Sequence, residues 1–188
     1  GTAVLTTHGE FTADQIVIAA GSWSPNVAVG LNLPLPVQAA KGYSITFTRP
    51  SWRPRLPISM GDSQTMITPL PQAIRIGGTL ELAGLDRSVR LRRVQAILDS
   101  TTKFIPGIQF DGHAPDAELW SGLRPLAPDT LPIIGRPRAH SNIIVATGHG
   151  TLGISLGPAT GEAVTSMVTG TIPPVNLRPY NPDRFTIS

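Results

Sequence analysis

Residues 120–161 read WSGLRPLAPDTLPIIGRPRAHSNIIVATGHGTLGISLGPATG, and this stretch organises the whole chain. The apolar run 142–147 predicts a buried strand that leads directly into a glycine-rich turn at 148–153. A helix is predicted next, over about residues 155–169. Glycines let a backbone approach a ligand closely, and the free N–H groups of a first helical turn point toward it. The stretch therefore predicts a strand, turn and helix that hold an anion or a dipole.

A second apolar run, 16–20, matches the first in character and predicts another buried strand, covered on both faces as in parallel sheets. The turn GSWSP follows it at 21–25, where Gly21 permits close approach and Ser22 or Ser24 is expected to cap the next turn. The residues between these two strands have a different pattern of apolar and polar residues. We therefore expect one lobe built from both ends of the chain, with a second lobe inserted between them.

The middle of the chain predicts a mostly antiparallel sheet. Residues 41–48 alternate between apolar and polar, and short strands are predicted at 58–60, 65–68 and 73–82. Their connections are too short for crossover helices, which favours antiparallel pairing. Asp86 is expected to cap a helix over about 87–104. The predicted fold class is α/β (α+β), in three pieces, 1–35, 36–119 and 120–188.

Composition narrows the classes of protein to consider. The 188 residues are 40% hydrophobic and 14% charged, with 19 Gly and 19 Pro, which indicates a loop-rich globular protein. The absence of cysteine excludes disulfides and thiolate sites and fits a cytoplasmic protein. The four histidines are scattered, so no metal site is predicted. The net charge is +3, and its densest arginine cluster, 87–93, lies on a helix with an apolar stripe, which favours a solvated face over nucleic-acid binding.

Five segments together resemble FAD-dependent amino-acid oxidoreductases of the D-amino-acid dehydrogenase and glycine oxidase (DAO) superfamily. They are IVIAAGSWS (16–24), KGYSIT (41–46), GLRPLAPDTLP (122–132), IGR (134–136) and TGHGTLG (147–153). They span nearly the whole chain in the order that the family uses. The resemblance implies that 1–35 and 120–188 form part of a Rossmann-like FAD lobe, and that 36–119 form an inserted substrate lobe.

One family feature has no counterpart in this sequence. The family begins with a strand, a G-x-G-x-x-G turn and an acidic residue that hold the ADP half of FAD. The resemblance therefore places this chain in the C-terminal half of a flavoenzyme, with the N-terminal half as its expected partner and the isolated chain inactive. We also expect an exposed apolar face beside the strands 16–20 and 143–147, and self-association through it. The alternative is a non-catalytic subunit or interaction module of the same fold.

The resemblance also implies substrate contacts. Arg124, in the GLRP motif, is expected to bind the carboxylate of the amino acid, and a planar guanidinium suits that task. The alternative is an arginine that bonds the carbonyls of its own loop. Tyr43 and Thr68 are further expected substrate contacts. An aromatic residue on a half-buried strand is more often part of a core, however, and spacing does not decide which face carries Thr68.

The implied FAD contacts are Ala20, Gly21, Trp23, Lys41, Gly42, Gly135, Arg136, Gly148, His149, Gly150, Thr151, Leu152 and Gly153. Backbone N–H groups of the glycine turn are expected to stabilise negative charge on the reduced flavin. His149 is expected to pack near the ring, and no side chain is expected to act as acid or base. The implied reaction is hydride transfer from the α-carbon of an amino acid, in the first instance a D-amino acid, to flavin N5. The resemblance further allows a peripheral contact of the full enzyme with the inner membrane.

Overall fold

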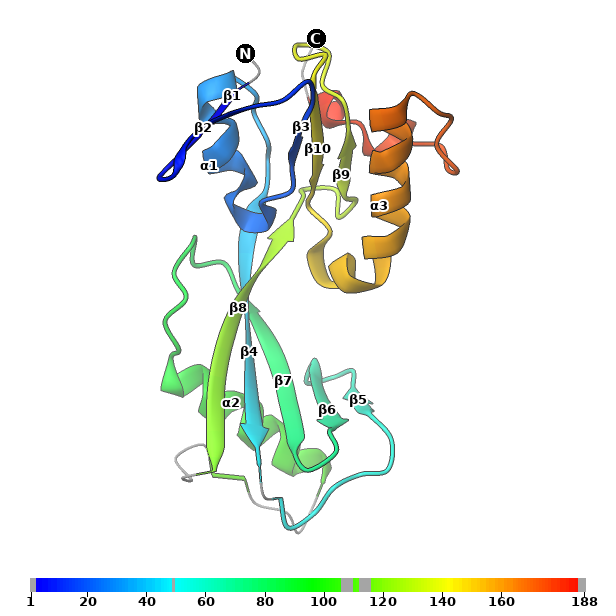
Figure 1. The fold of residues 1–188 in the computed structure, drawn as a ribbon. Helices are drawn as coiled ribbons and strands as arrows, with labels where there is room; N and C mark the ends of the chain where they lie inside the picture. Colours follow the sequence, from blue (N-terminus) through cyan, green and yellow to red (C-terminus); the bar gives the residue numbers. More distant parts are fainter. Residues whose placement is uncertain (1–2, 49, 106–109, 112–115, 186–188) are drawn as a thin grey trace. The chain divides into compact units, whose positions relative to one another are not determined.

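The computed structural model describes residues 3–48, 50–105, 110–111 and 116–185. The chain divides into two compact units. The outer unit contains Gly1–Ala39 and Arg124–Ser188, and the inserted unit contains Ala40–Leu123. Strands β4 (Gln38–Phe47) and β8 (Ala117–Leu126) carry the chain across the two boundaries (Figure 1). The expected boundaries, after residues 35 and 119, each fall four residues before the observed ones.

The outer unit is built on a three-stranded sheet with the order β3-β10-β9. Strand β3 (Ile16–Ile18) runs parallel to β10 (Ile143–Thr147), and β9 (Ile133–Gly135) runs antiparallel to β10. The two apolar runs that were predicted to be strands are thus neighbours in one sheet. A separate hairpin of β1 (Ala3–Thr6) and β2 (Gly9–Thr12) precedes the sheet.

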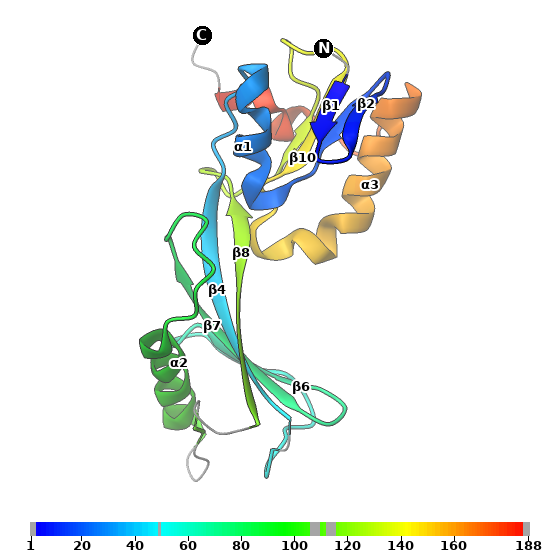
Figure 2. The same cartoon turned by 60° about the vertical axis from the view of Figure 1, so that its left-hand side comes forward.

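Helical segments lie on both faces of this sheet (Figures 1 and 2). One face packs against α1 (Ser24–Ala28), which lies between the short 3-10 turns η1 (Gly21–Trp23) and η2 (Val29–Leu31). The other face packs against α3 (Gly153–Thr169), which follows the 3-10 turn η3 (Gly150–Leu152). The chain then continues through η4 (Arg178–Tyr180) and η5 (Pro182–Phe185). The resulting core contains Ile18, Ala28, Leu33, Leu35, Ala127, Ile133, Ile143 and Val145.

Two local expectations about β3 and its turn were wrong. Neither Ser22 nor Ser24 is an N-cap, because Ala20 and Trp23 occupy the N-cap positions and no side chain bonds there. Strand β3 is not covered on both faces, since Val17 is 41% exposed while Ile18 is buried. The reason is that β3 lies at the edge of the sheet, whereas α3 packs over β9 and β10.

The inserted unit contains a five-stranded sheet with the order β5-β6-β7-β4-β8. Strands β5 (Ile58–Met60), β6 (Thr65–Pro69), β7 (Ile74–Glu81) and β4 pair in antiparallel fashion, as predicted. Helix α2 (Leu91–Phe104) covers one face of this sheet (Figure 2). The core between them contains Tyr43, Ile45, Phe47, Met60, Ile67, Ile74, Ile76, Val94, Ile97 and Leu98.

Helix α2 begins later than predicted. Its first residue is Leu91, and the N-cap residue Arg90 makes no side-chain cap bond. Asp86 instead accepts hydrogen bonds from the backbone N–H and the hydroxyl of Ser88, both at 2.8 Å. Asp86 therefore closes a tight turn ahead of the helix, and the prediction that it caps α2 was wrong.

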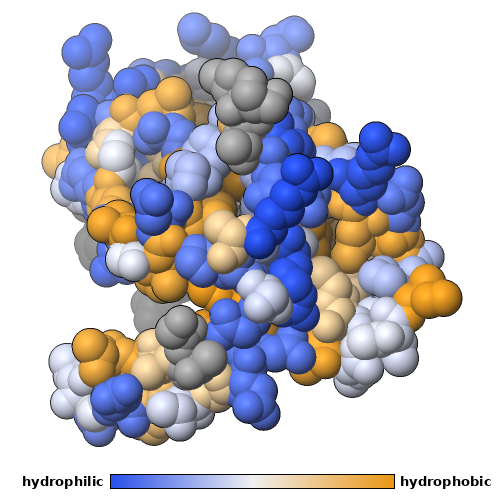
Figure 3. All heavy atoms as spheres, turned by 90° about the horizontal axis from the view of Figure 1, so that it is seen from above, coloured by the Kyte–Doolittle hydropathy of each residue, from blue (hydrophilic) through white to orange (hydrophobic). Residues whose placement is uncertain are grey.

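Several large apolar side chains lie on the surface of the outer unit. Ile154 is 95% exposed and Ile172 is 93% exposed. One face of the chain shows apolar residues among hydrophilic ones (Figure 3). In the described ranges, no helix is both long enough and apolar enough to cross a membrane.

Candidate functional site

The glycine turn between β10 and α3 leaves backbone donors available. Gly148 and Gly150 adopt left-handed conformations, with φ values of +76° and +57°, which glycine reaches without strain. His149 and Leu152 stand at the N-caps of η3 and α3, and neither makes a side-chain cap bond. The first turns of both helices also lack acidic residues. The N-terminus of α3 can therefore receive a negatively charged or dipolar group from outside this chain.

The turns that follow β3 and β10 lie side by side. The Thr147 hydroxyl donates a hydrogen bond of 2.9 Å to the carbonyl oxygen of Gly21. This contact follows from the parallel pairing of the two strands, since the carboxyl ends of parallel neighbours meet at one edge of a sheet. Among the predicted cofactor residues, Gly21 and the 148–153 turn are thus brought together. Ala20 is partly buried beside them, and Trp23 is exposed.

A cavity of about 420 Å³ adjoins this edge within the outer unit. Its sheet side includes Val17, Ala19 and Ala146, and its helix side includes Gly157 and Gly161 of α3. A Cβ atom added at either glycine would meet nothing within 4 Å. Gly161 was expected to permit a close backbone approach, but in the described structure it faces open space. We call this hollow between the exposed side of β3 and the glycines of α3 the α3 groove.

His149 connects the glycine turn to two other elements. Its Nε2 lies 2.9 Å from the Thr160 hydroxyl oxygen on α3, and its backbone forms an isolated bridge with Leu126 at the end of β8. Burial lowers the pKa of the His149 imidazole. The ring is therefore neutral at pH 7, which suits packing and hydrogen bonding better than charge stabilisation.

Arg124 lies two residues before Leu126 in β8, close in sequence to the bridge with the glycine turn. Its side chain is partly buried, and no hydrogen bond or ion pair joins it to another residue in the described part of the chain. The alternative of an arginine that bonds its own loop is therefore not seen among those residues. The neighbouring Pro125 lines the α3 groove. Arg124 thus has a guanidinium without a partner among the described residues, and the next residue along β8 lines the α3 groove.

Arg136 and Gly135 occupy a different part of the outer unit. The Arg136 guanidinium donates to the Gln15 side chain at 2.8 Å and to the Met167 carbonyl at 3.1 Å, near the C-terminal end of α3. Because α3 has 17 residues, its two ends are about 25 Å apart. A Cβ on Gly135 would lie 3.0 Å from Cδ of Pro182. These contacts hold the fold together, and they do not place the pair beside the glycine turn.

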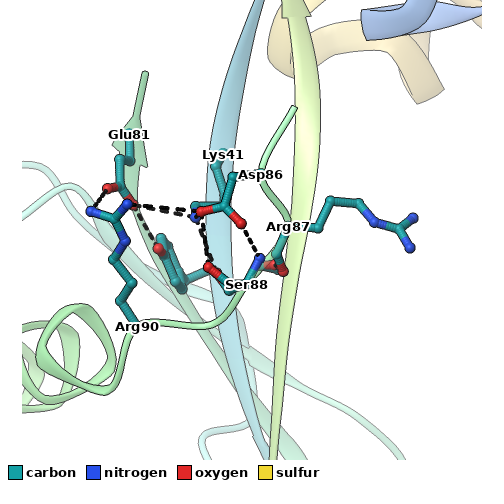
Figure 4. A network of polar contacts seen from close by, with 8 residues as sticks. Lys41, Glu81, Asp86, Arg87, Ser88 and Arg90 are labelled. Carbon is teal, nitrogen blue, oxygen red and sulfur yellow. Dashed lines mark hydrogen bonds and ion pairs between the residues drawn. The ribbon is translucent and has the colours of Figure 1, made fainter. Parts of the chain in front are cut away.

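In the inserted unit, Lys41 is committed to a buried polar cluster (Figure 4). Its side chain is fully buried, and Nζ donates to Asp86 Oδ2 at 2.9 Å and to the Ser88 carbonyl at 3.0 Å. Glu81 Oε2 lies 3.7 Å from the same nitrogen. Arg90 completes the cluster, 2.7 Å from Glu81 Oε1. We call this set the Lys41 network.

The charges of the Lys41 network stabilise one another. The hydrogen bond from the Tyr43 hydroxyl, 2.6 Å from Glu81 Oε2, lowers the pKa of the Glu81 carboxyl. Hydrogen bonds from Ser88 and Lys41 lower the pKa of Asp86 far below its usual range. The hydrogen bond to Asp86 raises the pKa of Lys41. Sequence reasoning missed this network, although a lysine within a buried alternating strand was its visible signal.

The expected substrate contacts Tyr43 and Thr68 lie on opposite faces of the inserted sheet. Tyr43 is buried in the core that faces α2. Thr68 follows the core residue Ile67 on β6, so it lies on the other face, where it pairs with Arg75 of β7. Gly42 sits at a register shift between β4 and β7 and pairs with Leu80. Only Thr68 of the expected pair therefore keeps a position open to a ligand.

Known proteins that resemble the chain share one family. The model of the DAO family, FAD dependent oxidoreductase, matches residues 1–167. The chain is 33% identical over 183 residues to a D-amino-acid oxidase of Bradyrhizobium diazoefficiens, covering 97% of this chain and 44% of that protein. It is 37% identical over 187 residues to a D-amino acid dehydrogenase of Xanthobacter autotrophicus, covering 98% of this chain and 44% of the relative.

A solved structure shows the same likeness. Glycine oxidase from Geobacillus kaustophilus superposes with a TM-score of 0.80 at 26% sequence identity, covering 98% of this chain and 49% of that one. The chain therefore spans less than half the length of each of these relatives.

Proposed function

The chain belongs to the DAO family of FAD-dependent oxidoreductases, and from this we propose that it forms the C-terminal part of an enzyme that oxidises amino acids. The names of its relatives favour a D-amino acid as substrate. The observation that carries the proposal is the position of Arg124. Its guanidinium has no partner among the described residues, and β8 ends two residues later at the bridge to the glycine turn.

The residues of the outer unit fit a flavin. The glycine turn offers uncapped backbone donors, and the α3 groove lies beside it, with Gly157 and Gly161 among the residues on its helix wall. We propose that N–H groups of 148–153 face the flavin ring, with Gly21 nearby. When bound, FAD supplies the acceptor for the α-hydrogen of the substrate as hydride. The N–H groups and the helix dipole stabilise the negative charge that this transfer brings.

Arg124 binds and orients the substrate in this proposal. A guanidinium stays charged at all working pH values and grips a carboxylate with two parallel hydrogen bonds. Such a grip holds the α-carbon in a fixed position, and orientation is a large part of what a protein adds to a cofactor reaction. Neutral His149 holds the glycine turn in place through Thr160, and no side chain is needed as a base.

We further propose that the N-terminal half of the enzyme occupies the free side of the outer unit. Strand β3 has only β10 as a partner in the described sheet, so its other edge can accept a further strand. Beside it, Gly157 and Gly161 of α3 line the α3 groove, and glycines on a helix surface allow a second helix to approach closely. A strand and helix from the missing half fit these two vacancies together.

The test compares Arg124→Met with Arg124→Lys in the complete FAD-loaded enzyme. Hydrogen bonds to charged groups contribute about 1.5–3 kcal/mol, so we expect Arg124→Met to lower kcat/KM for D-amino acids by roughly 10- to 100-fold. Arg124→Lys should recover part of this loss. The absorbance spectrum of the bound flavin should stay unchanged in both variants. An unchanged kcat/KM in Arg124→Met would refute the substrate role.

A further inference from the structure

Arg184 anchors the C-terminal segment of the chain to the outer unit. This segment, η5, lies beside β9 in the same unit (Figure 1). Phe185 packs against the core of the unit, and the guanidinium of Arg184 lies over its ring, 4.2 Å from the ring centroid. The side chain of Arg184 is only 15% exposed, so protein groups must replace the water that its charge has lost.

The protein satisfies all the N–H donors of Arg184. Nε and Nη2 donate to the two carboxylate oxygens of Asp129, at 2.7 and 3.0 Å, which is a bidentate pair. Nη2 also donates to the Leu131 carbonyl at 2.9 Å. Nη1 donates to the carbonyl oxygens of Tyr180 and Asn181, at 2.8 and 3.2 Å. These five hydrogen bonds match the five donors of a guanidinium, so they hold the side chain in one orientation.

Arg184 thereby holds a turn whose backbone is strained. The turn consists of residues 127–132, and we call it the supporting turn. Thr130 has a φ of +64°, a left-handed conformation that residues other than glycine seldom adopt. The Thr130 N–H donates to the Ala127 carbonyl at 3.0 Å. A strained conformation persists where surrounding contacts enforce it, and the pair of Arg184 with Asp129 is such a contact from outside the turn.

The glycine turn rests on the two ends of the supporting turn. A Cβ atom built on Gly148 would lie 3.4 Å from Cβ of Ala127 and 3.4 Å from both N and Cγ1 of Ile133. Ala127 and Ile133 are both buried. One residue before Ala127, Leu126 forms the backbone bridge with His149. Because protein interiors are closely packed, a displacement of the supporting turn must move the glycine turn as well.

We propose that Arg184 is a positioning residue for the flavin, because it fixes the supporting turn through Asp129 and thereby fixes the backbone donors of the glycine turn. This inference rests on the proposed function, in which the glycine turn faces the flavin ring. Donors stabilise a developing charge only when they are held at the right distance, so a small displacement of the turn weakens their effect. The hydrogen bond from Arg184 lowers the pKa of the Asp129 carboxyl, which keeps the pair ionised at neutral pH.

The first test titrates the FAD-free form of the complete enzyme with FAD. Arg138→Met is the matched control for Arg184→Met, because the Arg138 side chain is 94% exposed and lies 3.9 Å from its partner Asp183. We expect Arg184→Met to raise the Kd for FAD by roughly 10-fold, and Arg138→Met to change it by about 2-fold or less. Arg184→Lys should recover part of the loss, since it keeps the charge without the bidentate geometry. Equal Kd values for wild type and Arg184→Met would overturn the inference.

The second test separates positioning from a role in stability alone. An arginine that only stabilises the fold would leave the reduction potential of the bound flavin unchanged at saturating FAD. We expect a lower potential in Arg184→Met than in Arg138→Met, because displaced N–H donors stabilise the reduced, negatively charged flavin less. The same potential in both variants would overturn the inference and leave Arg184 as a contact that holds the fold.

The third test needs neither FAD nor turnover. Amide hydrogen exchange of the FAD-free enzyme, followed by mass spectrometry, reports on peptides that cover 148–153. We expect these peptides to exchange faster in Arg184→Met than in the wild type and in Arg138→Met. Faster exchange confined to 127–132 and 182–185 would contradict the inference, because the loss of Arg184 would then not reach the glycine turn.

Asp129→Asn tests the path from Arg184 to the supporting turn. It keeps the size of the side chain and removes its charge, so it should weaken FAD binding about as much as Arg184→Met. The double variant should weaken binding little further, because the two residues act as one pair. Additive losses would show that Arg184 acts by another route and would overturn the inference. If Arg184→Met does not fold, Arg184→Lys, Asp129→Asn and their double variant give the same cycle.

These outcomes separate the two proposals. A wild-type complete enzyme that binds no FAD would refute the proposed function itself. An enzyme that binds FAD with the same Kd and the same reduction potential in wild type, Arg184→Met and Asp129→Asn would refute only the role of Arg184.

Discussion

Gly161 tests the α3 groove because its replacement should affect the isolated chain and the complete enzyme in opposite directions. Glycine inside a helix costs about 0.5–1 kcal/mol relative to alanine. Gly161 lies in the interior of α3, and an added Cβ meets nothing within 4 Å. Gly161→Ala should therefore stabilise the isolated chain by about 0.5–1 kcal/mol. For a chain of this size, the midpoint of thermal unfolding should rise by roughly 1–4 °C.

A larger side chain at the same position should block the groove. Gly161→Leu keeps a good helix former in α3, so the isolated chain should fold at least as stably as the wild type. Its side chain enters the space that we assign to the N-terminal half, so FAD binding by the complete enzyme should weaken. Ala159→Leu is the matched control, because Ala159 is exposed on α3 and does not line the groove.

The assay is urea unfolding of the isolated chain, followed by circular dichroism, together with FAD titration of the complete enzyme. Gly170→Ala calibrates the first measurement. Gly170 caps α3 with a φ of +72°, so alanine there should destabilise the chain by about 1 kcal/mol. Destabilisation by Gly161→Ala would show that the groove is filled in the isolated chain. Equal FAD affinities for Gly161→Leu and Ala159→Leu would show that the groove receives nothing in the enzyme.

Two further predictions concern the ionisable groups. The pKa values of Asp86 and Glu81 are lowered in the folded state, so the stability that they contribute is fully present above their unfolded values of about 4 and is lost as pH falls below them. The urea midpoint measured from pH 6 to pH 3 should therefore fall less steeply in Asp86→Asn than in the wild type. Lys41→Met should lower the urea midpoint at pH 7, because it leaves the carboxylates of Glu81 and Asp86 without their buried cation. The pKa of His149 is also lowered in the folded state. Its contribution to the stability of the fold is therefore present above about pH 6.5 and decreases as pH falls. NMR titration of the ring should give an apparent pKa below that value, and a pKa at or above it would contradict the burial of the imidazole.

Much of the outer unit was predictable because its signals are local. Two short apolar runs identified β3 and β10, and the glycines of 148–153 identified the turn ahead of α3. Their convergence was also predictable, since parallel strands end at the same edge of a sheet. The exposure of one face of β3 could not be predicted, because the exposure of Val17 depends on which strand lies at the edge of the sheet and on where α3 packs.

The candidate site was less predictable because side chains compete for partners that are distant in sequence. Asp86 looked like a helix cap, yet Lys41, 45 residues away, and Ser88 hold its carboxylate in a turn. Arg136 matched a family motif, yet it bonds Gln15, 121 residues away, and the end of α3. Spacing along the chain carries no information on such long-range pairs.

The sequence by itself determined the order of the elements, the insertion of an antiparallel sheet between two strands that pair in parallel, and the motifs that indicate a flavin and an amino acid. These features depend on periodicity, glycine geometry and short-range connections, all of which are properties of the local sequence. Only the tertiary structure decided which sheet face each residue occupies. It placed Tyr43 in the core and left Trp120 58% exposed, because the packing of α2 buries one side of the inserted sheet.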